Sequence, residues 1–277
     1  MRHTQAEALS GRVALVSGAT GSMGAAIAQR LADEGAAVVG VGRTSESGLG
    51  VAKQIVAGGG RACFVTADVS CEDQVREAVA AAVESFGRLD VVVNAAAATE
   101  LLRGASEQPV VDEPTEVFDR MMRVNLYGPF WTAKYAIPHM LRTGTGGAIV
   151  SVSSISASRV DRSMPAYAAS KAGLEGLTRQ IATDYGERGI RVNAIALGSI
   201  RSVETAHIHD DPVNGPARRR NRMIPEPGTV QDVAELVAYL ASPRSAFLTA
   251  AVVPLDGGAM SAYPAPVIAD AKSDKEG

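Results

Sequence analysis

The chain contains 277 residues, of which 46% are hydrophobic and 21% are charged, and its formal net charge is −3. This composition excludes a wholly disordered chain, and the weakly acidic balance gives no reason to expect nucleic acid or an anionic membrane as a partner. No apolar run approaches the roughly 18 residues that span a bilayer, and the first residues lead into no apolar signal segment. We therefore expect a cytoplasmic protein without membrane contact.

Several metal-site and hydrolase motifs are missing from the sequence. Cys63 and Cys71 form no CxxC pair and the histidines form no HExxH motif, so neither a disulfide framework nor a metal site is expected. His207 and His209 could hold a metal adventitiously in their Asp-rich segment, although a solvated loop explains them more simply. The lack of GxSxG and GxxxxGK(S/T) also argues against a nucleophile-elbow hydrolase and a P-loop nucleotidase.

Short apolar runs alternate with amphipathic stretches along the chain. Helices are predicted at about 23–34, up to 57, 70–86, 117–141, 165–187 and 229–240, with Thr229 and Ser70 (followed by the acidic Asp73) as expected N-caps. Strands are predicted at 13–16, 37–41, 63–65, 89–93, 148–152, 190–195 and 251–253. Because the strands are apolar throughout and separated by helices, they predict an α/β, doubly wound fold with a seven-stranded parallel sheet.

Residues 1–261 are predicted to form a single domain, followed by a tail at 262–277 that is flexible or packs on a partner subunit. Within the domain, residues 202–228 contain four arginines, two histidines and four prolines but show little periodicity. Because this segment lies between a predicted strand and a predicted helix, we expect it to be a mobile insertion near a binding site.

A glycine-rich turn joins the first predicted strand to the first helix, with the sequence Ser17-Gly18-Ala19-Thr20-Gly21-Ser22-Met23-Gly24. Glycines permit a tight turn and let backbone N–H groups approach phosphate oxygens, while the helix N-terminus adds partial positive charge. An ordinary tight turn is the alternative, but the position in the first βα unit favours dinucleotide binding.

The end of the second predicted strand favours one nicotinamide cofactor over the other. In such folds an acidic residue here binds the ribose 2′-hydroxyl, whereas an arginine suits a 2′-phosphate. The sequence has Arg43 and Thr44 here, and no acid before Glu46. Because a guanidinium can clamp a phosphate through its planar fork, NADP(H) is favoured over NAD(H); an exposed loop arginine is the alternative.

Tyr167 and Lys171 are four residues apart on a predicted helix and therefore share one face. A lysine ammonium beside a phenol lowers the tyrosine pKa, which would give a general acid/base usable near neutral pH. A solvated surface pair is the alternative. Ser154 favours the functional interpretation, because it follows the fifth strand at the carboxyl edge of the sheet, where doubly wound folds bind ligands.

Together these residues carry a family resemblance. The chain resembles the short-chain dehydrogenase/reductase family over about residues 11–260. The matching positions are Gly18-x3-Ser22-x-Gly24, Asp68-Val69, Asn94-Ala95-Ala96, Asn125, Ser154, Tyr167-x3-Lys171 and Arg191-Val192-Asn193. The resemblance implies a Rossmann-like domain and NAD(P)-dependent carbonyl or alcohol chemistry.

The resemblance also implies roles for individual residues. Tyr167 would be the acid/base, Lys171 would also hold the nicotinamide ribose, and Ser154 would polarise the carbonyl. Asn125 would position a water in a proton relay through Lys171. The implied cofactor-binding set is Gly18, Thr20, Ser22, Met23, Gly24, Arg43, Thr44, Asp68 (adenine), Val69, Asn94 (adenosine-side backbone), Ala95, Ala96, Tyr167, Lys171, Leu197, Gly198 and Ile200.

Three positions depart from the family pattern. Ser22 stands where the family has a middle glycine, Asn94-Ala95-Ala96-Ala97 replaces Asn-Asn-Ala-Gly, and Leu197-Gly198 replaces Pro-Gly. Each departure changes the wall of the cofactor cleft, and none removes a catalytic group.

The sequence is interpreted as an NADP(H)-dependent oxidoreductase that interconverts a ketone and a secondary alcohol of a small molecule by hydride transfer. One alternative is a 3-oxoacyl (carrier-protein) or polyketide ketoreductase, because clustered arginines could receive an acidic carrier or its phosphate. These are Arg218, Arg219, Arg220 and Arg222. A non-catalytic nucleotide-binding protein on the same fold is a further alternative.

Two expectations concern the long predicted helices. The family pairs them across a two-fold axis, so the resemblance implies a homotetramer through residues 117–141 and 165–187. Pro129 lies four residues after Asn125 and lacks an N–H, so the first helix should kink and leave the Asn125 carbonyl free. We expect this carbonyl to bind an ordered water that also reaches Lys171, completing the relay to Tyr167.

Overall fold

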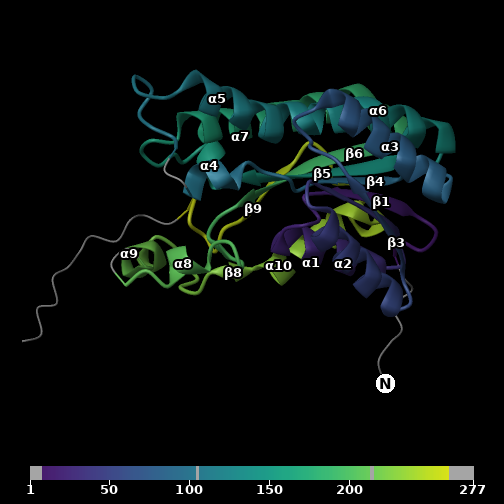
Figure 1. The fold of residues 1–277 in the computed structure, drawn as a ribbon, viewed down its shortest axis with the longest axis horizontal. Helices are drawn as coiled ribbons and strands as arrows, with labels where there is room; N and C mark the ends of the chain where they lie inside the picture. Colours follow the sequence, from purple (N-terminus) through teal and green to yellow (C-terminus); the bar gives the residue numbers. More distant parts are fainter. Residues whose placement is uncertain (1–7, 104–105, 213–214, 262–277) are drawn as a thin grey trace, which may run out of the picture.

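A parallel sheet forms the centre of the computed structural model, which describes residues 8–103, 106–212 and 215–261 (Figure 1). Its strand order is β3-β2-β1-β4-β5-β6-β9, and every neighbouring pair is parallel. The strands are β1 (Val13–Ser17), β2 (Ala37–Gly42), β3 (Arg61–Thr66), β4 (Val91–Asn94), β5 (Gly147–Ser154), β6 (Ile190–Leu197) and β9 (Val252–Leu255). The predicted doubly wound, seven-stranded sheet is confirmed, whereas the predicted tail at 262–277 lies outside the described residues.

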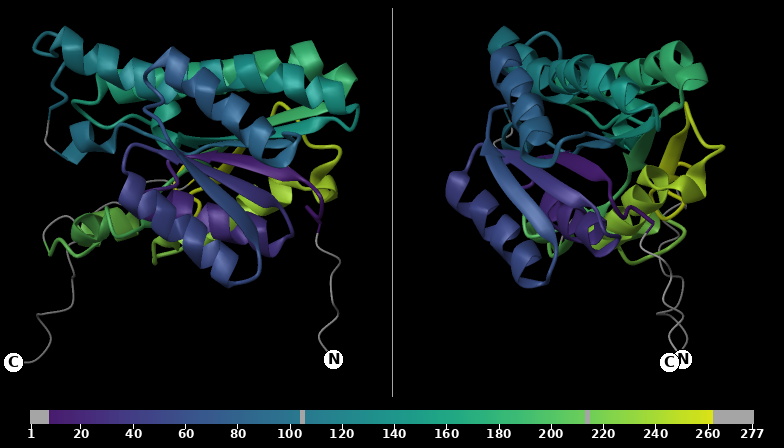
Figure 2. Two further views of the ribbon diagram at one scale, coloured as in Figure 1. Left: turned by 45° about the vertical axis from the view of Figure 1, so that its right-hand side comes forward. Right: turned by 90° about the vertical axis from the view of Figure 1, so that its right-hand side faces the viewer.

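Helices cover both faces of this sheet, as Figures 1 and 2 show. One face carries α1 (Ser22–Asp33), α2 (Ser45–Ala57) and α10 (Val230–Ala241). The other carries α3 (Glu72–Phe86), α5 (Thr115–Met122), α6 (Gly128–Thr143) and α7 (Pro165–Tyr185). Shorter helices are α4 (Thr99–Arg103) and three 3₁₀ turns at Ile155–Ala157, Gly186–Arg188 and Pro243–Ser245.

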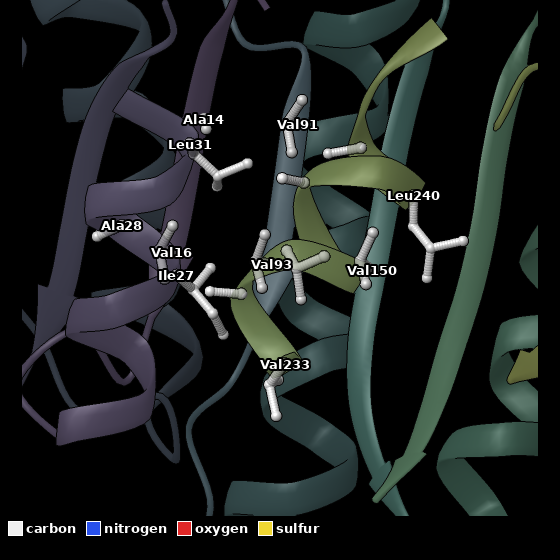
Figure 3. Close-up of a cluster of buried hydrophobic side chains, with 14 of the residues drawn as sticks. Ala14, Val16, Ile27, Ala28, Leu31, Val91, Val93, Val150, Val233 and Leu240 are labelled. Atoms are coloured by element: carbon white, nitrogen blue, oxygen red, sulfur yellow. The ribbon is translucent and has the colours of Figure 1, made fainter. Parts of the chain in front are cut away.

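The core explains why the strand sequences are apolar on both faces. Ile27 and Leu31 of α1 and Val233 of α10 cluster with Val93 of β4, and all four side chains are 0% exposed (Figure 3). A second cluster on the opposite face includes residues of α3, α6 and α7. Because both faces are packed, the carboxyl ends of the strands and the turns that follow them are held in fixed positions.

Two helix starts test the predicted N-caps. Thr229 caps α10 as expected: its hydroxyl accepts from the N–H of Asp232 at 3.2 Å, and its own N–H donates to the Asp232 carboxylate at 2.7 Å. The prediction of Ser70 as the N-cap of α3 is wrong, because Cys71 takes that position. Ser70 instead donates its N–H to Oδ1 of Asp68 at 2.9 Å, so a local Asx turn replaces the expected cap.

The helix predicted at 117–141 is divided into α5 and α6. A π-helical turn at Arg123–Tyr127 separates them, and the N–H of Gly128 donates to the carbonyl of Arg123, five residues earlier. Pro129 therefore lies in the first turn of a new helix, where the lack of an N–H costs little. The irregularity expected near Pro129 takes this form.

Residues 199–228 contain short elements that the sequence did not predict. They are β7 (Ile200–Arg201), α8 (Ala206–His209), α9 (Gly215–Arg220) and β8 (Gly228–Thr229), and β7 pairs with β8 as a separate parallel ladder. In Figure 1, α8 and α9 lie at the same end of the molecule as α4. Across the described ranges, no helix is both long and apolar enough to cross a membrane.

Candidate active site

A cleft of about 470 Å³ opens at the carboxyl edge of the central sheet. It includes the ends of β1 and β4, whose chains continue to opposite faces of the sheet, the position at which doubly wound folds bind ligands. Thr44, Asn94 and Asn125 are predicted site residues outside its lining. The predicted residues that line it are Gly18, Thr20, Ser22, Met23, Gly24, Arg43, Asp68, Val69, Ala95, Ala96, Ser154, Tyr167, Lys171, Leu197, Gly198 and Ile200.

The glycine-rich turn is sterically fixed at two of its glycines. Gly18 has a φ of 76°, and a Cβ at this position would lie 2.7 Å from the backbone nitrogen of Ala96. A Cβ on Gly24 would lie 2.1 Å from the carbonyl oxygen of Gly18, because α1 packs directly against the turn. The backbone path alone therefore requires these glycines, whereas Ser22 carries its side chain at the cleft.

A carboxylate that the sequence analysis did not select lies on this turn. Glu204, from the segment between β7 and α8, accepts a hydrogen bond from the N–H of Ser22 at 3.0 Å and a second, very short one from the Ser22 hydroxyl. Burial opposes ionisation of Glu204, but the hydrogen bonds from Ser22 and Ser202 lower its pKa to about 2. Glu204 is therefore an anion at the N-terminus of α1.

The rim of the cleft beyond β2 carries Arg43. Its Nη1 lies 3.4 Å from Oε1 of Glu100 in α4, and both side chains are exposed, so solvent weakens this ion pair. Arg43 follows the last residue of β2, which is where the sequence analysis expected it.

Asp68 lines the cleft with its carboxylate already engaged. Its Oδ1 accepts from the N–H of Ser70, and its Oδ2 accepts from the Arg120 guanidinium at 3.1 Å. Burial opposes ionisation, but the bonds from Ser70 and Arg120 hold the pKa of Asp68 below its usual value. The implied adenine contact would be made beside this ion pair.

Tyr167, Lys171 and Ser154 approach one another at the opposite end of the cleft. Nζ of Lys171 lies 5.7 Å from the centroid of the Tyr167 ring, as expected for residues one helical turn apart on α7. Ser154, the last residue of β5, accepts from the N–H of Ser156 at 3.1 Å. Its hydroxyl hydrogen is left to interact with the Tyr167 phenol.

The expected lowering of the Tyr167 pKa is wrong for this structure. Burial raises the pKa of the phenol, the hydrogen bond with Ser154 lowers it, and the negative charge of Glu107 raises it. The Lys171 ammonium makes its hydrogen bond to the backbone instead of to the phenol: Nζ donates to the carbonyl of Val152 at 2.8 Å.

Lys171 is itself only 2% exposed. Burial lowers its pKa to about 8, and the carboxylate of Glu175, one turn further along α7, opposes that change. Glu175 in turn accepts from the hydroxyl of Ser153 at 2.9 Å. At pH 7 the ammonium form therefore predominates and supplies a positive charge inside the protein.

Asn125 lies in the π-helical turn and uses its side chain to join three segments. Its Oδ1 accepts from the N–H of Ala98 at 3.1 Å, and its Nδ2 donates to Oγ of Ser170 at 3.1 Å and lies 3.0 Å from Sδ of Met121. It therefore ties the loop after β4 to the helix that carries Tyr167. These side-chain bonds do not connect the backbone carbonyl of Asn125 to Lys171. The proton relay through a water between those two groups therefore stays a prediction.

Two further buried groups surround this end of the site. Glu107, only 5% exposed, accepts from the N–H of Tyr167 at 2.9 Å at the start of α7, and burial raises its pKa. Its Oε2 accepts no hydrogen bond from the residues that the structure describes. Asn94 donates from Nδ2 to Oγ of Ser151 at 3.2 Å, while its buried Oδ1 has no partner among the described residues.

Comparison with known proteins identifies the family. A family model described as enoyl-(acyl carrier protein) reductase matches residues 18–260. The chain is 38% identical over 256 residues to an A-factor type gamma-butyrolactone 1′-reductase of Streptomyces virginiae, with 90% of this chain and 96% of the relative covered. A solved short-chain type dehydrogenase/reductase from Mycobacterium ulcerans superimposes with a TM-score of 0.86 at 31% identity, covering 92% of this chain and 91% of that one.

This protein belongs to the short-chain dehydrogenase/reductase family. It is similar, at 37% identity over 252 residues, to a cis-4-hydroxycyclohexanecarboxylate dehydrogenase of Sinomonas cyclohexanicum, which covers 91% of this chain and 98% of the relative. A blue fluorescent protein from a metagenomic library, solved in complex with NADPH, has the same fold with a TM-score of 0.83 at 32% identity, over 91% of this chain and 99% of that one. The protein is therefore an oxidoreductase of the CH–OH/C=O class that uses a nicotinamide cofactor.

The cleft of this dehydrogenase/reductase fits such a cofactor by its donors. The strand order β2-β1-β4-β5 places Arg43 after β2, the N-terminus of α1 after β1, and Lys171 beside β5, where it donates to Val152. The glycine at position 18 lets the turn pass close to the backbone of Ala95 and Ala96, which line the same cleft.

Sequence reasoning missed two of the carboxylates that shape this site. Glu107 lies 60 residues before Tyr167, and Glu204 lies 182 residues after Ser22, so no local spacing connects either pair. The only available signal for Glu204 was its place in the aperiodic segment at 202–228. Further lining residues outside the predicted set include Ala67, Leu102, Ser202, Thr205, Ile208 and His209.

Proposed function

We propose that this protein is an NADP(H)-dependent enzyme that interconverts a ketone and a secondary alcohol, with Tyr167 as the acid/base. The observation that carries the proposal is the meeting of Tyr167, Ser154 and Lys171 in a cleft that also contains the glycine-rich turn. The catalytic groups and the phosphate-binding geometry thus belong to one continuous site within residues 1–261, which we take as a single catalytic domain.

The chemistry divides between the bound cofactor and the side chains. The nicotinamide supplies or accepts the hydride. During reduction, the Tyr167 hydroxyl donates its proton to the developing alkoxide, and the Ser154 hydroxyl donates a hydrogen bond to the same oxygen. Lys171, with a pKa of about 8, keeps a positive charge 5.7 Å from the centroid of the Tyr167 ring, and we assign it to the nicotinamide ribose.

Asn125 completes the proposed proton path. Its side chain is engaged with Ala98, Ser170 and Met121, so we assign its backbone carbonyl to the proton path. We keep the proposal that this carbonyl holds a water that reaches Lys171, which returns a proton to Tyr167 after each turnover.

The preference for NADP(H) rests on Arg43. The guanidinium lies at the rim of the cleft directly after β2, and its partner Glu100 is exposed and 3.4 Å away. A 2′-phosphate offers more charge and bidentate geometry than this carboxylate, so it would displace Glu100 from Arg43.

The substrate proposed here is a ring-bearing ketone or secondary alcohol. The lining of the cleft that contains Tyr167 includes the apolar side chains of Leu102, Ile200 and Ile208. Both relatives described above carry a ring compound in their names, a butyrolactone and a hydroxycyclohexanecarboxylate. An apolar wall opposite hydroxyl donors suits a compact ring whose single carbonyl points toward Ser154 and Tyr167.

The carrier-protein alternative loses one of its four arginines. Arg222 is 8% exposed and donates to the carbonyls of Ile224 and Pro225, so it is committed to the fold of its own loop. Arg219 and Arg220 are exposed, whereas the side chain of Arg218 lies outside the described residues.

We also propose that the enzyme is a homotetramer. Ala169, Ala172 and Gly176 lie on one face of α7, and a Cβ on Gly176 would meet open space. Tyr127 and Phe130, at the start of α6, are 48% and 42% exposed. Burial of these aromatic rings against a second copy would remove apolar surface from water. Light scattering that gave the monomer mass at micromolar concentration would reject the proposal.

The proposed activity is tested by following nicotinamide absorbance. The purified protein is mixed with NADPH and a panel of cyclic ketones, open-chain ketones and acyl thioesters. Oxidation of NADPH with cyclic ketones, lost in Tyr167→Phe, is the expected result. Turnover restricted to carrier-bound thioesters would favour the ketoreductase alternative, and binding without turnover would favour a non-catalytic nucleotide-binding protein.

A further inference from the structure

The contact between Glu204 and Ser22 joins the two parts of the site that the fold builds separately. Ser22 begins α1 at the cofactor turn, whereas Glu204 comes from the segment between β7 and α8. Both carboxylate oxygens are used: one accepts from the Ser22 N–H and the other from the Ser22 hydroxyl. The hydroxyl donor exists only because serine stands where a glycine was expected from the family pattern.

The carboxylate of Glu204 lies at the N-terminus of α1, a position that favours an anion. The N-terminal amides of α1 are unpaired within the helix and carry its partial positive charge. Oε1 of Glu204 lies 3.7 Å from the point where a Cβ on Gly21 would stand, so the carboxylate rests directly on the turn. An anionic side chain of the protein thus occupies two donors at this helix end, the N–H and the hydroxyl of Ser22, where a phosphate group would bind.

Charge makes this occupancy exclusive. With a pKa of about 2, Glu204 remains ionised across the physiological pH range, so protonation does not release it. A diphosphate brought to the same amides would meet a carboxylate at hydrogen-bond distance from them, and like charges at that separation repel. Either Glu204 or the diphosphate can occupy the turn, but not both.

The segment that carries Glu204 is itself held by hydrogen bonds. Oγ1 of Thr205 donates to the carbonyl of Ile200 at 2.7 Å and accepts from the N–H of Ser202 at 2.9 Å. These bonds lie within residues 200–205 and do not involve the carboxylate. Glu204 can therefore leave Ser22 by side-chain rotation or by movement of the short turn around it.

We propose that Glu204 is a built-in competitor for the diphosphate of the cofactor, and that cofactor binding must displace it from Ser22. This inference rests on the proposed function for the identity of the cofactor. Glu204 belongs to a segment that lines the same cleft as Tyr167, so the displaced carboxylate stays within the site. The free enzyme binds cofactor less tightly than its donors alone would allow, since the open form is only a fraction of the population.

The decisive experiment compares Glu204→Gln with wild type by calorimetric titration of two probes, NADPH and inorganic pyrophosphate. The variant keeps the side-chain size but removes the charge. We expect the dissociation constant of each probe to fall roughly tenfold, the effect of removing one charge-assisted contact that must otherwise be broken. Glu226→Gln, which removes an exposed carboxylate from the same loop without touching Ser22, should leave both constants unchanged.

A second variant protects the test against misfolding. Ser22→Ala removes only the hydroxyl donor, so it should tighten binding by a smaller factor than Glu204→Gln. In the free enzyme, Glu204→Gln should also speed hydrogen–deuterium exchange of the Ser22 amide. Unchanged exchange, or probe binding that is equal or weaker in both variants, would overturn the inference.

The two proposals fail in different ways. If NADPH binds none of the proteins but pyrophosphate binds Glu204→Gln more tightly than wild type, the proposed function is wrong and the competition stands. If NADPH binds wild type and Glu204→Gln with equal affinity, the competition is wrong and the proposed function stands. If neither probe binds any variant, the turn is not an anion site and both fail.

Discussion

The framework of sheet and α7 differs from the segment at 199–228 in what holds each in place. The framework positions Tyr167 and Lys171 by burial: Lys171 is 2% exposed and the helix packs on the central strands. The segment is held by surface contacts, such as the bidentate pair of Arg201 and Asp210 at 2.9 Å, both exposed. The proposed acid/base thus lies on the packed part of the molecule, whereas the segment at 199–228 has the weaker anchoring expected of a surface loop.

The largest expected effect comes from the framework. Tyr167→Phe removes the hydroxyl that donates the proton to the substrate oxygen, so kcat should fall by about 10²–10⁴, far more than NADPH binding weakens. Steady-state kinetics and calorimetry measure the two quantities. Arg219→Ala, in the surface segment, is the control and should leave turnover of free ketones unchanged. A variant Tyr167→Phe with near wild-type kcat would remove tyrosine from the mechanism.

The next largest effect is on the free energy of unfolding, which a substitution in the framework should lower much more than one in the surface segment. Leu31→Ala empties a fully buried position on α1 and should lower the free energy of unfolding by about 2–5 kcal/mol. Arg201→Ala breaks an exposed ion pair and should leave the Tm unchanged within error. Denaturant titration of both variants checks the contrast. An equal loss in the two would mean that the surface segment is part of the cooperative core.

Arg43 shares one property with each region: its side chain is exposed, like the surface segment, but its backbone directly follows β2 of the framework. Arg43→Ala should weaken NADPH binding by roughly ten- to hundredfold, because one charge-assisted contact to the 2′-phosphate is lost. NADH binding should stay the same, since it carries no such phosphate. Fluorescence titration with both cofactors measures the difference. Unchanged NADPH affinity, or an initial preference for NADH, would contradict the assignment.

The smallest expected effect is a shift of the Tyr167 pKa within the framework. The negative charge of Glu107 raises the pKa of Tyr167, so Glu107→Gln should lower that pKa. Alcohol oxidation needs the deprotonated phenol as base. The rise of the oxidation rate with pH should therefore occur at lower pH in the variant, as a pH–rate profile would show. Glu113→Gln is the matched control, because the charge of Glu113 acts on Glu107 but does not shift the pKa of Tyr167 directly.

Sequence alone predicted the framework well because its signals are local. Apolar runs fix the strands, the turn glycines follow from steric contacts such as Gly24 against Gly18, and the i, i+4 spacing of Tyr167 and Lys171 fixes their shared face. The cap of α3 was predicted wrongly because Asp68 offers a competing hydrogen bond two residues earlier. A local sequence pattern cannot decide between two candidate N-caps at adjacent positions, here Ser70 and Cys71.

Sequence could not predict the electrostatics. The pKa of Tyr167 depends on burial and on Glu107, which lies 60 residues earlier in the sequence and meets the start of α7 only in the folded chain. The contact between Glu204 and Ser22 spans 182 residues and comes from a segment without periodicity. Such contacts arise from the path of a loop, and a loop path is specified by few residues.

The π-helical turn at Arg123–Tyr127 fixes the rotational phase of α6. Its hydrogen bond spans five residues instead of the four of an α turn, so the turn holds one extra residue while the helices before and after it keep their phase. Deleting one residue from this turn would let an α turn form in its place and would leave Ala133 and Ile137 in the core cluster that they share with α3. Deleting one residue from the middle of α6 would instead rotate every later side chain by about 100° and move apolar side chains out of that cluster, so this second deletion should be far more harmful than the first.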